Sequence, residues 1–128
     1  MPARDHQPTR ELLEFVELFN AREFEASHEA LMAAWARNRG NEFYKGLIQL
    51  AGAFQHWTSK NAFWAEDLFA SAHNLLEKYV PRHQGLDVAA LIEAIRRCHE
   101  VAREARLAGS VEPFEERMPQ VRLTFGSP

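Results

Sequence analysis

Apolar residues recur at helical spacing through most of the chain, in segments separated by short polar turns. The segments begin after Thr9, Asn20, Asn41, Asn61 and Asp87, and the last one ends at Gly109. Positions three and four apart share one face of an α-helix, so each segment predicts a helix with one buried face. Thr, Asn and Asp at the starts are preferred N-caps. The pattern therefore predicts an all-α, single-domain bundle of about five helices.

The second start carries the most signals. Asn20 and Glu23 have the spacing of a capping box, and Phe19 and Phe24 have the spacing of a hydrophobic staple. We therefore expect the second helix to begin at Ala21, directly after a sharp turn at Asn20.

The second and third helices are expected to form a central antiparallel hairpin that turns near Gly40. The third helix, from Asn41 to about Lys60, has a wide apolar arc, which is typical of a helix with neighbours on two sides. Gly46 and Gly52 lie on its remaining stripe, although a mid-helix glycine costs about 1 kcal/mol relative to alanine. Two glycines on one stripe indicate the close approach of another backbone, although open solvent would also tolerate them.

The C-terminal residues leave the helical period. Pro113 and Pro119 interrupt any regular helix, and residues 121–125 alternate between apolar and polar, as in a strand. No other segment alternates in this way. We expect residues 1–8 to form a mobile N-terminal tail and residues 9–109 the helical bundle domain. Residues 110–128 are expected to form an extended C-terminal tail that packs on the bundle or on a partner.

Composition excludes several classes of protein. The chain has 128 residues and a net charge of −3, which argues against general nucleic-acid binding because phosphate neutralisation needs a basic surface. It has no apolar run long enough to span a bilayer and no secretory signal, so no membrane partner is expected. The single cysteine, Cys98, cannot form an internal disulfide, which fits a reducing compartment. The expected location is the cytoplasm.

A polar cluster is expected between the second and third helices, and it is the candidate site. In an antiparallel hairpin, His28 and Glu29 should lie near Gln49 and His56. One interpretation is a neutral core histidine that is hydrogen-bonded to Gln49 or to a backbone carbonyl. Another is a small-molecule pocket. The residues expected to line that pocket are Trp35, Tyr44 and Trp57.

A metal site is the third interpretation. His28 and His56, with Glu25 or Glu29, could supply nitrogen and oxygen ligands to zinc, iron or manganese. Glu25 and His28 have Glu-x-x-His spacing, but carboxylate-bridged di-iron sites need two such motifs and this chain has one. The zinc-protease signature HExxH is also absent. We therefore predict no cofactor and keep a metal as an alternative.

Several short motifs resemble those of a known family. In order they are Phe19-Asn20, His28-Glu29, Trp35, Gly46-Leu47-Ile48-Gln49-Leu50-Ala51 and Asn61. Over these residues the chain resembles the all-helical domain-of-unknown-function family 309 (DUF309). The resemblance implies a helical bundle and carries over no catalytic residue, because the family has no assigned activity. The family commonly has a second glutamate four residues after the histidine, and here that position is Met32.

No motif specifies a reaction or a substrate. We expect a cytosolic helical domain, binding or interacting in character, whose site is the polar cluster. One alternative is a metal-dependent hydrolase that uses His28, Glu29 and His56. The other is a homodimerising structural or partner-binding module that uses the C-terminal tail or an exposed aromatic patch near Phe63 and Trp64.

Overall fold

The structure is a computed structural model, and it describes residues 7–126. Most of the predicted N-terminal tail therefore lies outside the described residues. In chain order the elements are α2 (Arg10–Asn20), α3 (Phe24–Arg37), α4 (Glu42–Thr58), α5 (Ala62–Leu76), the 3-10 turn η1 (Glu77–Tyr79), the strands β1 (Arg82–His83) and β2 (Leu86–Asp87), α6 (Val88–Ala108) and the 3-10 helix η2 (Glu112–Arg117). These helices contain most of the described residues, which confirms the all-α class.

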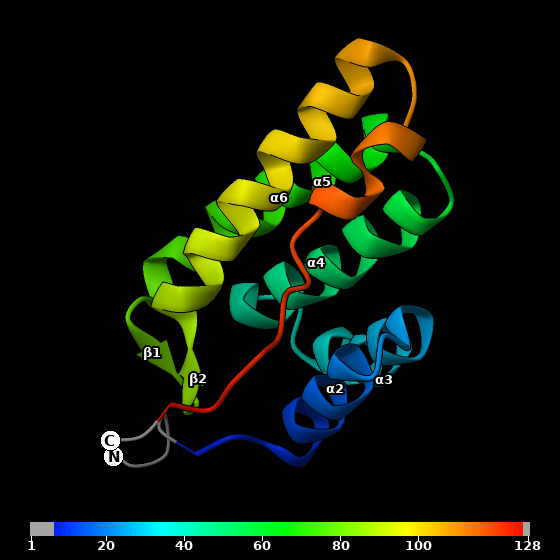
Figure 1. The fold of residues 1–128 in the computed structure, drawn as a ribbon. Helices are drawn as coiled ribbons and strands as arrows, with labels where there is room; N and C mark the ends of the chain where they lie inside the picture. The colour runs from blue at the N-terminus through cyan, green and yellow to red at the C-terminus, as the bar shows by residue number, and fades with distance from the viewer. Residues whose placement is uncertain (1–6, 127–128) are drawn as a thin grey trace.

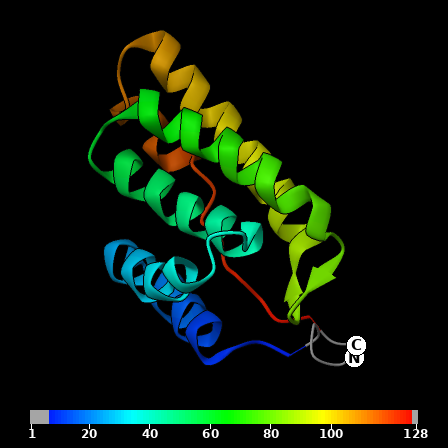
Figure 2. The same ribbon diagram turned by 180° about the vertical axis from the view of Figure 1, so that it is seen from behind.

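The helix α4 lies in the centre of the fold. It packs against α3, which pairs with α2, and on its other side against α5, which pairs with α6 (Figure 1; Figure 2). Its wide apolar arc is buried, and the arc consists of Phe43, Tyr44, Leu47, Ile48, Leu50, Ala51, Phe54 and Trp57. The prediction of a central third helix is confirmed. No helix within residues 7–126 is both long and apolar enough to cross a membrane.

Four of the predicted helix starts are correct, because each cap acts within its own first turn. The side chains of Thr9, Asn41, Asn61 and Asp87 accept hydrogen bonds from the backbone N–H groups of Leu12, Tyr44, Trp64 and Ala90, respectively, at 3.0–3.1 Å. Each bond satisfies one N–H group that the helix itself leaves unpaired.

The predicted start at Ala21 is wrong. The helix α2 continues through Asn20, and α3 begins at Phe24 with no side-chain cap from Glu23. Arg22 has a φ of 67°, and the N–H of Glu23 donates to the carbonyl of Leu18 at 2.9 Å, so the chain closes α2 with a left-handed turn. The side chain of Asn20 is not free to cap α3, because the C-terminal tail occupies it.

A short β-hairpin joins α5 to α6, in the region where the sequence predicts only a polar connection. Arg82 pairs with Asp87, and His83 pairs with Leu86. Gln84 and Gly85 form the two-residue turn, with φ values of 48° and 81°. Positive φ at both central positions is the geometry of the tightest hairpin turns. Strands of two residues are too short to show an alternating pattern, which is why the sequence does not reveal them.

The glycine stripe of α4 faces α5. A Cβ atom at Gly46 would lie 2.7 Å from Cγ of Leu76, and one at Gly52 would lie 3.5 Å from Cδ1 of Leu68. The first distance is shorter than any normal contact, so the side chain of Leu76 can pack this closely on α4 because position 46 has no side chain. The sequence predicted the close approach of another backbone, whereas the atoms nearest Gly46 belong to the side chains of Leu75 and Leu76.

The C-terminal tail packs along its own bundle. A 3-10 helix, η2, forms around Pro113, which the sequence does not predict, and the chain then runs extended past α4 to the β-hairpin (Figure 1). Val121 and Leu123 are buried, whereas Arg122 and Thr124 are exposed, in agreement with the alternating pattern, but Phe125 is 38% exposed and departs from it.

Backbone hydrogen bonds attach the end of the tail to the hairpin. The N–H of Asp87 donates to the carbonyl of Thr124 at 2.9 Å, and the N–H of Gly126 donates to the carbonyl of Gly85 at 2.9 Å. Leu86 and Phe125 form an antiparallel bridge between these bonds. The tail thus extends the edge of the hairpin.

Candidate functional site

An open groove lies where the start of α3, the end of α4 and the C-terminal tail meet. It encloses about 890 Å³. Residues 22–26 and Glu29 line it from the α3 side, residues 54–55 and 57–59 from α4, and Glu115 and residues 118–120 from the tail. Ligand sites in proteins commonly enclose roughly 300–1,000 Å³, so the volume suits a ligand. We call this surface the groove.

Stacked aromatic rings form part of its floor. The ring of Phe24 stacks on that of Phe54, with centroids 5.0 Å apart and an interplanar angle of 13°. Phe19 meets Phe24 edge-on at 5.1 Å, so the two residues of the predicted staple are in contact. Phe54 is buried and Phe24 is half-buried. The rings hold Phe24 in place while part of its surface stays accessible from the groove.

The remaining floor combines α4 with the tail. Trp57 and Met118 both line the groove and are almost completely buried, whereas Pro119 is half-buried. These side chains extend the apolar surface from the aromatic stack onto the tail. The groove therefore exists in this form because the tail is docked.

Arg22 joins the start of α3 to the tail. Its Nη1 donates to the carbonyl of Val121 at 2.6 Å, and its guanidinium carbon lies 5.9 Å from the ring centroid of Phe24. A charged donor to a carbonyl is a strong form of hydrogen bond, so this contact favours the docked tail.

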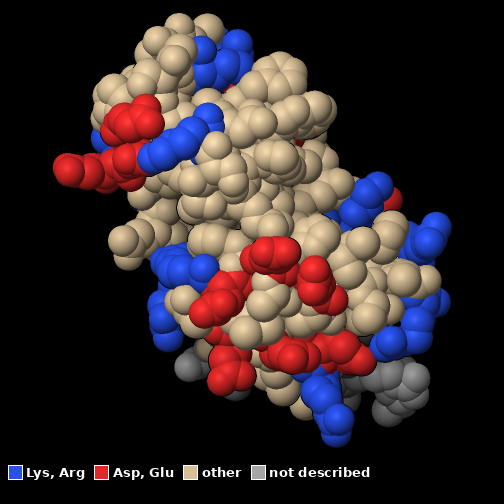
Figure 3. Space-filling view, turned by 90° about the vertical axis from the view of Figure 1, so that its right-hand side faces the viewer, with Lys and Arg blue, Asp and Glu red and all other residues tan. Residues whose placement is uncertain are grey.

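The rim of the groove is acidic. Glu23, Glu25 and Glu29 are exposed, and none of them forms an ion pair or a side-chain hydrogen bond with any residue in 7–126. The fourth lining carboxylate, Glu115, accepts a hydrogen bond from Lys60, and this bond raises the pKa of the lysine. Figure 3 shows acidic side chains gathered on this side of the molecule, around an area without charge.

Two helix ends add partial charges of opposite sign. The end of α4 presents carbonyl groups and attracts cations, whereas the start of α3 presents N–H groups and attracts anions. Each end is equivalent to roughly half an elementary charge. Glu23 and Glu25 stand at the α3 end and offset its positive potential. The full charges of the carboxylates therefore set the potential of the groove.

The four residues of the predicted polar cluster do not form a network. No hydrogen bond or ion pair links any two of His28, Glu29, Gln49 and His56, all of which are described. His56 lies beside Trp64 of α5, with ring centroids 6.4 Å apart. Gln49 shares the glycine-containing stripe of α4 with His56 by helical spacing. The sequence does not reveal how α4 is rotated about its axis, and this rotation turns that stripe toward α5.

Glu29 is the member of that cluster that lines the groove, whereas His28 is half-buried elsewhere on α3. The Oε1 atom of Gln49 is buried and has no hydrogen-bond partner in the described part of the chain. Two other candidates, Glu25 and Trp57, also line the groove.

The expected pocket of Trp35, Tyr44 and Trp57 is divided among different places. Trp35 is half-buried with the guanidinium of Arg39 lying 5.6 Å from its ring centroid, and its Nε1 has no partner among the described residues. Trp57 lines the groove, but neither Trp35 nor Tyr44 does.

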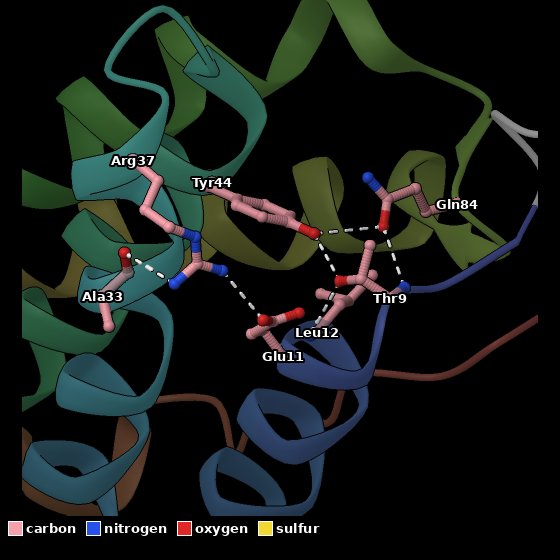
Figure 4. A network of polar contacts seen from close by, with 7 residues as sticks. All are labelled: Thr9, Glu11, Leu12, Ala33, Arg37, Tyr44 and Gln84. Carbon is pink, nitrogen blue, oxygen red and sulfur yellow. Dashed lines mark hydrogen bonds and ion pairs between the residues drawn. The ribbon is translucent and has the colours of Figure 1, made fainter.

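Tyr44 instead joins three elements in a polar network (Figure 4). Its hydroxyl donates to Oε1 of Gln84 at 3.4 Å and forms a short hydrogen bond of 2.5 Å with Oγ1 of Thr9. Because the Tyr44 hydroxyl donates its one proton to Gln84, its oxygen accepts from the hydroxyl of Thr9, whose Oγ1 also accepts from Leu12 N–H. Tyr44 thereby connects the start of α2 to the β-hairpin.

The predicted metal ligands do not converge. Within residues 7–126, no three His, Cys, Asp or Glu side chains are placed to hold a metal ion together. His28, His56 and Glu25 or Glu29 therefore do not form a ligand set in this structure.

The sequence did not point to the tail residues of the groove. The alternation after residue 120 predicted that the tail docks, but the side chains that face the groove are Met118, Pro119 and Gln120, just before the alternating stretch. Docking to a surface far away in sequence carries no local signal.

Comparison with protein families adds a relationship to this geometry. Residues 12–68 match a family model described as a domain of unknown function, DUF309. The resemblance to DUF309 is confirmed. The match spans α2, α3, α4 and the first half of α5, so it includes the helical side of the groove and excludes the tail. No curated protein and no solved structure matches the chain.

The DUF309 match leaves the activity open, because the family description gives none. Met32, at the position where the family commonly has a glutamate, is 37% exposed on α3 and does not line the groove. This departure from the family therefore leaves the groove unchanged.

Proposed function

We propose that this chain is a binding domain and that the groove receives a segment of a partner protein. The observation that carries the proposal is a concave surface that combines the half-buried apolar side chains of Phe24 and Pro119 with a polar rim. Protein interfaces typically have this anatomy, with an apolar centre and a polar edge.

The half-buried ring of Phe24 supports the proposal. An accessible aromatic surface that its neighbours already hold in place loses little conformational freedom when a ligand covers it. Rigid contact surfaces of this kind bind more tightly because less entropy is lost on binding. Phe24 has this support from Phe19 and Phe54.

The three unpaired rim carboxylates also support it. Charged groups at an interface set the choice of partner and the rate of association. Glu23, Glu25 and Glu29 have no partner among the described residues, so a ligand does not have to displace an internal ion pair to reach them.

Titration of the ¹⁵N-labelled chain with end-capped peptides tests the proposal. The peptides fall into apolar, anionic and cationic sets, and amide chemical shifts report the contact surface. We expect at least one set to shift the amides of residues 22–29, 54–59 and 118–120. A null result with every set would overturn the proposal.

A blocking variant locates the binding. Ala26 is exposed and lines the groove, whereas Ala36 is exposed on α3 outside it. We expect Ala26→Trp to abolish the shifts and Ala36→Trp to leave them intact. Equal binding by both variants would show that the groove is not the site. A dimer of the unmodified chain that Ala26→Trp dissociates would show that a second copy occupies the groove, and it would also overturn the proposal.

A further inference from the structure

We infer that the segment bound in the groove is cationic and amphipathic, with Lys or Arg side chains flanking an apolar anchor. This inference rests on the proposed function, and it names the chemistry of the partner.

The unpaired carboxylates carry the first step. Glu25 and Glu29 are four positions apart on α3 and share one face, and Glu23 precedes them at the start of the helix. Like charges four apart on a helix repel each other. A cation placed among these carboxylates is attracted to them, and it also reduces the repulsion between them. Both effects favour the binding of a cation.

The basic side chain of the groove is already engaged. Arg22 is the one basic residue among the described lining residues, and its guanidinium holds the carbonyl of Val121. Moving it toward an anionic ligand would release the tail that forms one side of the groove. The guanidinium keeps its charge, but the α3 side of the lining carries three carboxylates against this one cation, so an anionic peptide or a nucleic acid would meet a net negative charge.

The tail side of the groove also leads to a cationic ligand. Lys60, two residues beyond the end of α4, forms ion pairs with Glu115 and, at 3.9 Å, with Glu112 of the tail, and it does not line the groove. The carboxylates without an ion-pair partner are therefore those on the α3 side, and their charge is negative. A ligand with complementary charge presents its cations to α3.

The apolar floor specifies the anchor. Phe24 and Pro119 are both half-buried and present apolar surface to the groove, while the buried Phe54 stacks against Phe24. A Leu or Phe side chain of the ligand would cover this floor while its neighbouring cations reach the rim. Buried anchors of this type dominate the affinity of most interfaces.

Fluorescence anisotropy with defined probe peptides tests the inference. The first probe carries lysines on both sides of a Leu-Phe pair, the second replaces each lysine with glutamate, and the third replaces the Leu-Phe pair with serines. We expect the first probe to bind, with an affinity that falls as salt increases, because exposed charges are screened. We expect the other two to bind at least tenfold more weakly.

Two variants with the same net charge separate the effect of the rim carboxylates on binding from the effect of the net charge of the chain. Glu25→Gln/Glu29→Gln removes two rim carboxylates, and Glu14→Gln/Glu17→Gln removes two exposed carboxylates of α2 outside the groove. We expect the first variant to weaken the lysine probe by roughly tenfold, since each exposed pair contributes modestly. The second should change it less than about twofold, because screening limits the reach of distant charges.

The outcomes distinguish the two proposals. If an uncharged or anionic peptide shifts the groove amides in the unmodified chain but not in Ala26→Trp, while the lysine probe does not bind, the inference about charge is overturned and the proposed function stands. If no peptide binds in the groove, both fail. Equal weakening by the two charge variants would mean attraction to net charge alone and would overturn the inference.

Discussion

The side-chain amide of Asn20 and the backbone of Leu123 form a closed pair of hydrogen bonds. Nδ2 of Asn20 donates to the carbonyl oxygen at 2.9 Å, and Oδ1 accepts from the N–H at 2.8 Å. An asparagine side chain carries a donor and an acceptor on one plane, so it can pair with one residue of an extended strand. This pair connects the last turn of α2 to a tail residue 103 positions away.

Replacement of Asn20 by alanine should loosen the tail. Both backbone groups of Leu123 would lose their partners, and such a loss typically costs about 1–3 kcal/mol of the free energy of unfolding. Urea denaturation measures this change, and amide hydrogen exchange at Leu123 should become faster. Asn20→Asp is the control. Its carboxylate still accepts from the N–H of Leu123, but it places an oxygen instead of a donor against the carbonyl of Leu123. Unchanged exchange at Leu123 in Asn20→Ala would contradict the prediction.

Alanine substitutions at the two glycines of α4 should have opposite effects. Alanine is a better helix former than glycine by about 1 kcal/mol, so Gly52→Ala should raise the free energy of unfolding by up to that amount. At Gly46 the new methyl group would lie 2.7 Å and 2.8 Å from two carbon atoms of the buried Leu76. Overpacking of a core typically costs about 1–3 kcal/mol, so Gly46→Ala should lower the free energy of unfolding. Thermal denaturation of both variants checks this, and a rise in the melting temperature of Gly46→Ala would refute the argument.

Cys98 should be unreactive in the folded chain. It is fully buried on the inner face of α6, and burial raises the pKa of its thiol from 9.0 to about 12. The thiolate is the reactive species, so a thiol reagent at pH 8 should modify Cys98 only as fast as the chain unfolds. Rapid labelling of the folded chain without denaturant would contradict this expectation.

The same raised pKa predicts a dependence of stability on pH. Between about pH 9 and 12, the unfolded chain releases the Cys98 proton and the folded chain keeps it. The free energy of unfolding therefore falls as pH rises, by up to about 1.4 kcal/mol per pH unit from this group. Below pH 8 the thiol contributes no slope. Comparison with Cys98→Ala isolates the effect, because lysines and tyrosines titrate equally in both chains. Parallel stability curves above pH 9 would show that the prediction is wrong.

Removal of the Tyr44 hydroxyl should weaken the connection between α2 and the β-hairpin. Tyr44→Phe loses the bonds to Thr9 and Gln84, and a net loss of about 0.5–1.5 kcal/mol is expected. Tyr79→Phe is the matched control, because the hydroxyl of Tyr79 forms no hydrogen bond with residues 7–126. Urea denaturation of both variants measures the difference. Equal stability of the two would remove the role assigned to Tyr44.

The sequence by itself determined the helical class, most helix starts and the docking pattern of the tail. These features depend on local interactions. The caps at Asn41, Asn61 and Asp87 act within one helical turn, and the alternation after residue 120 reports the burial of Val121 and Leu123, although Phe125 is exposed. Sequence motifs also identified the DUF309 relationship, which the family match confirmed.

The tertiary structure decided which residues meet. Asn20 had the local pattern of an N-cap, but Leu123 occupies its side chain, so α3 starts later than predicted. His56 was expected near His28, but the close packing at Gly46 turns its stripe toward α5. The groove likewise needs Met118 beside the start of α3. Each of these relationships depends on helix rotation or on contacts between distant segments, and local spacing in a sequence carries no information about either.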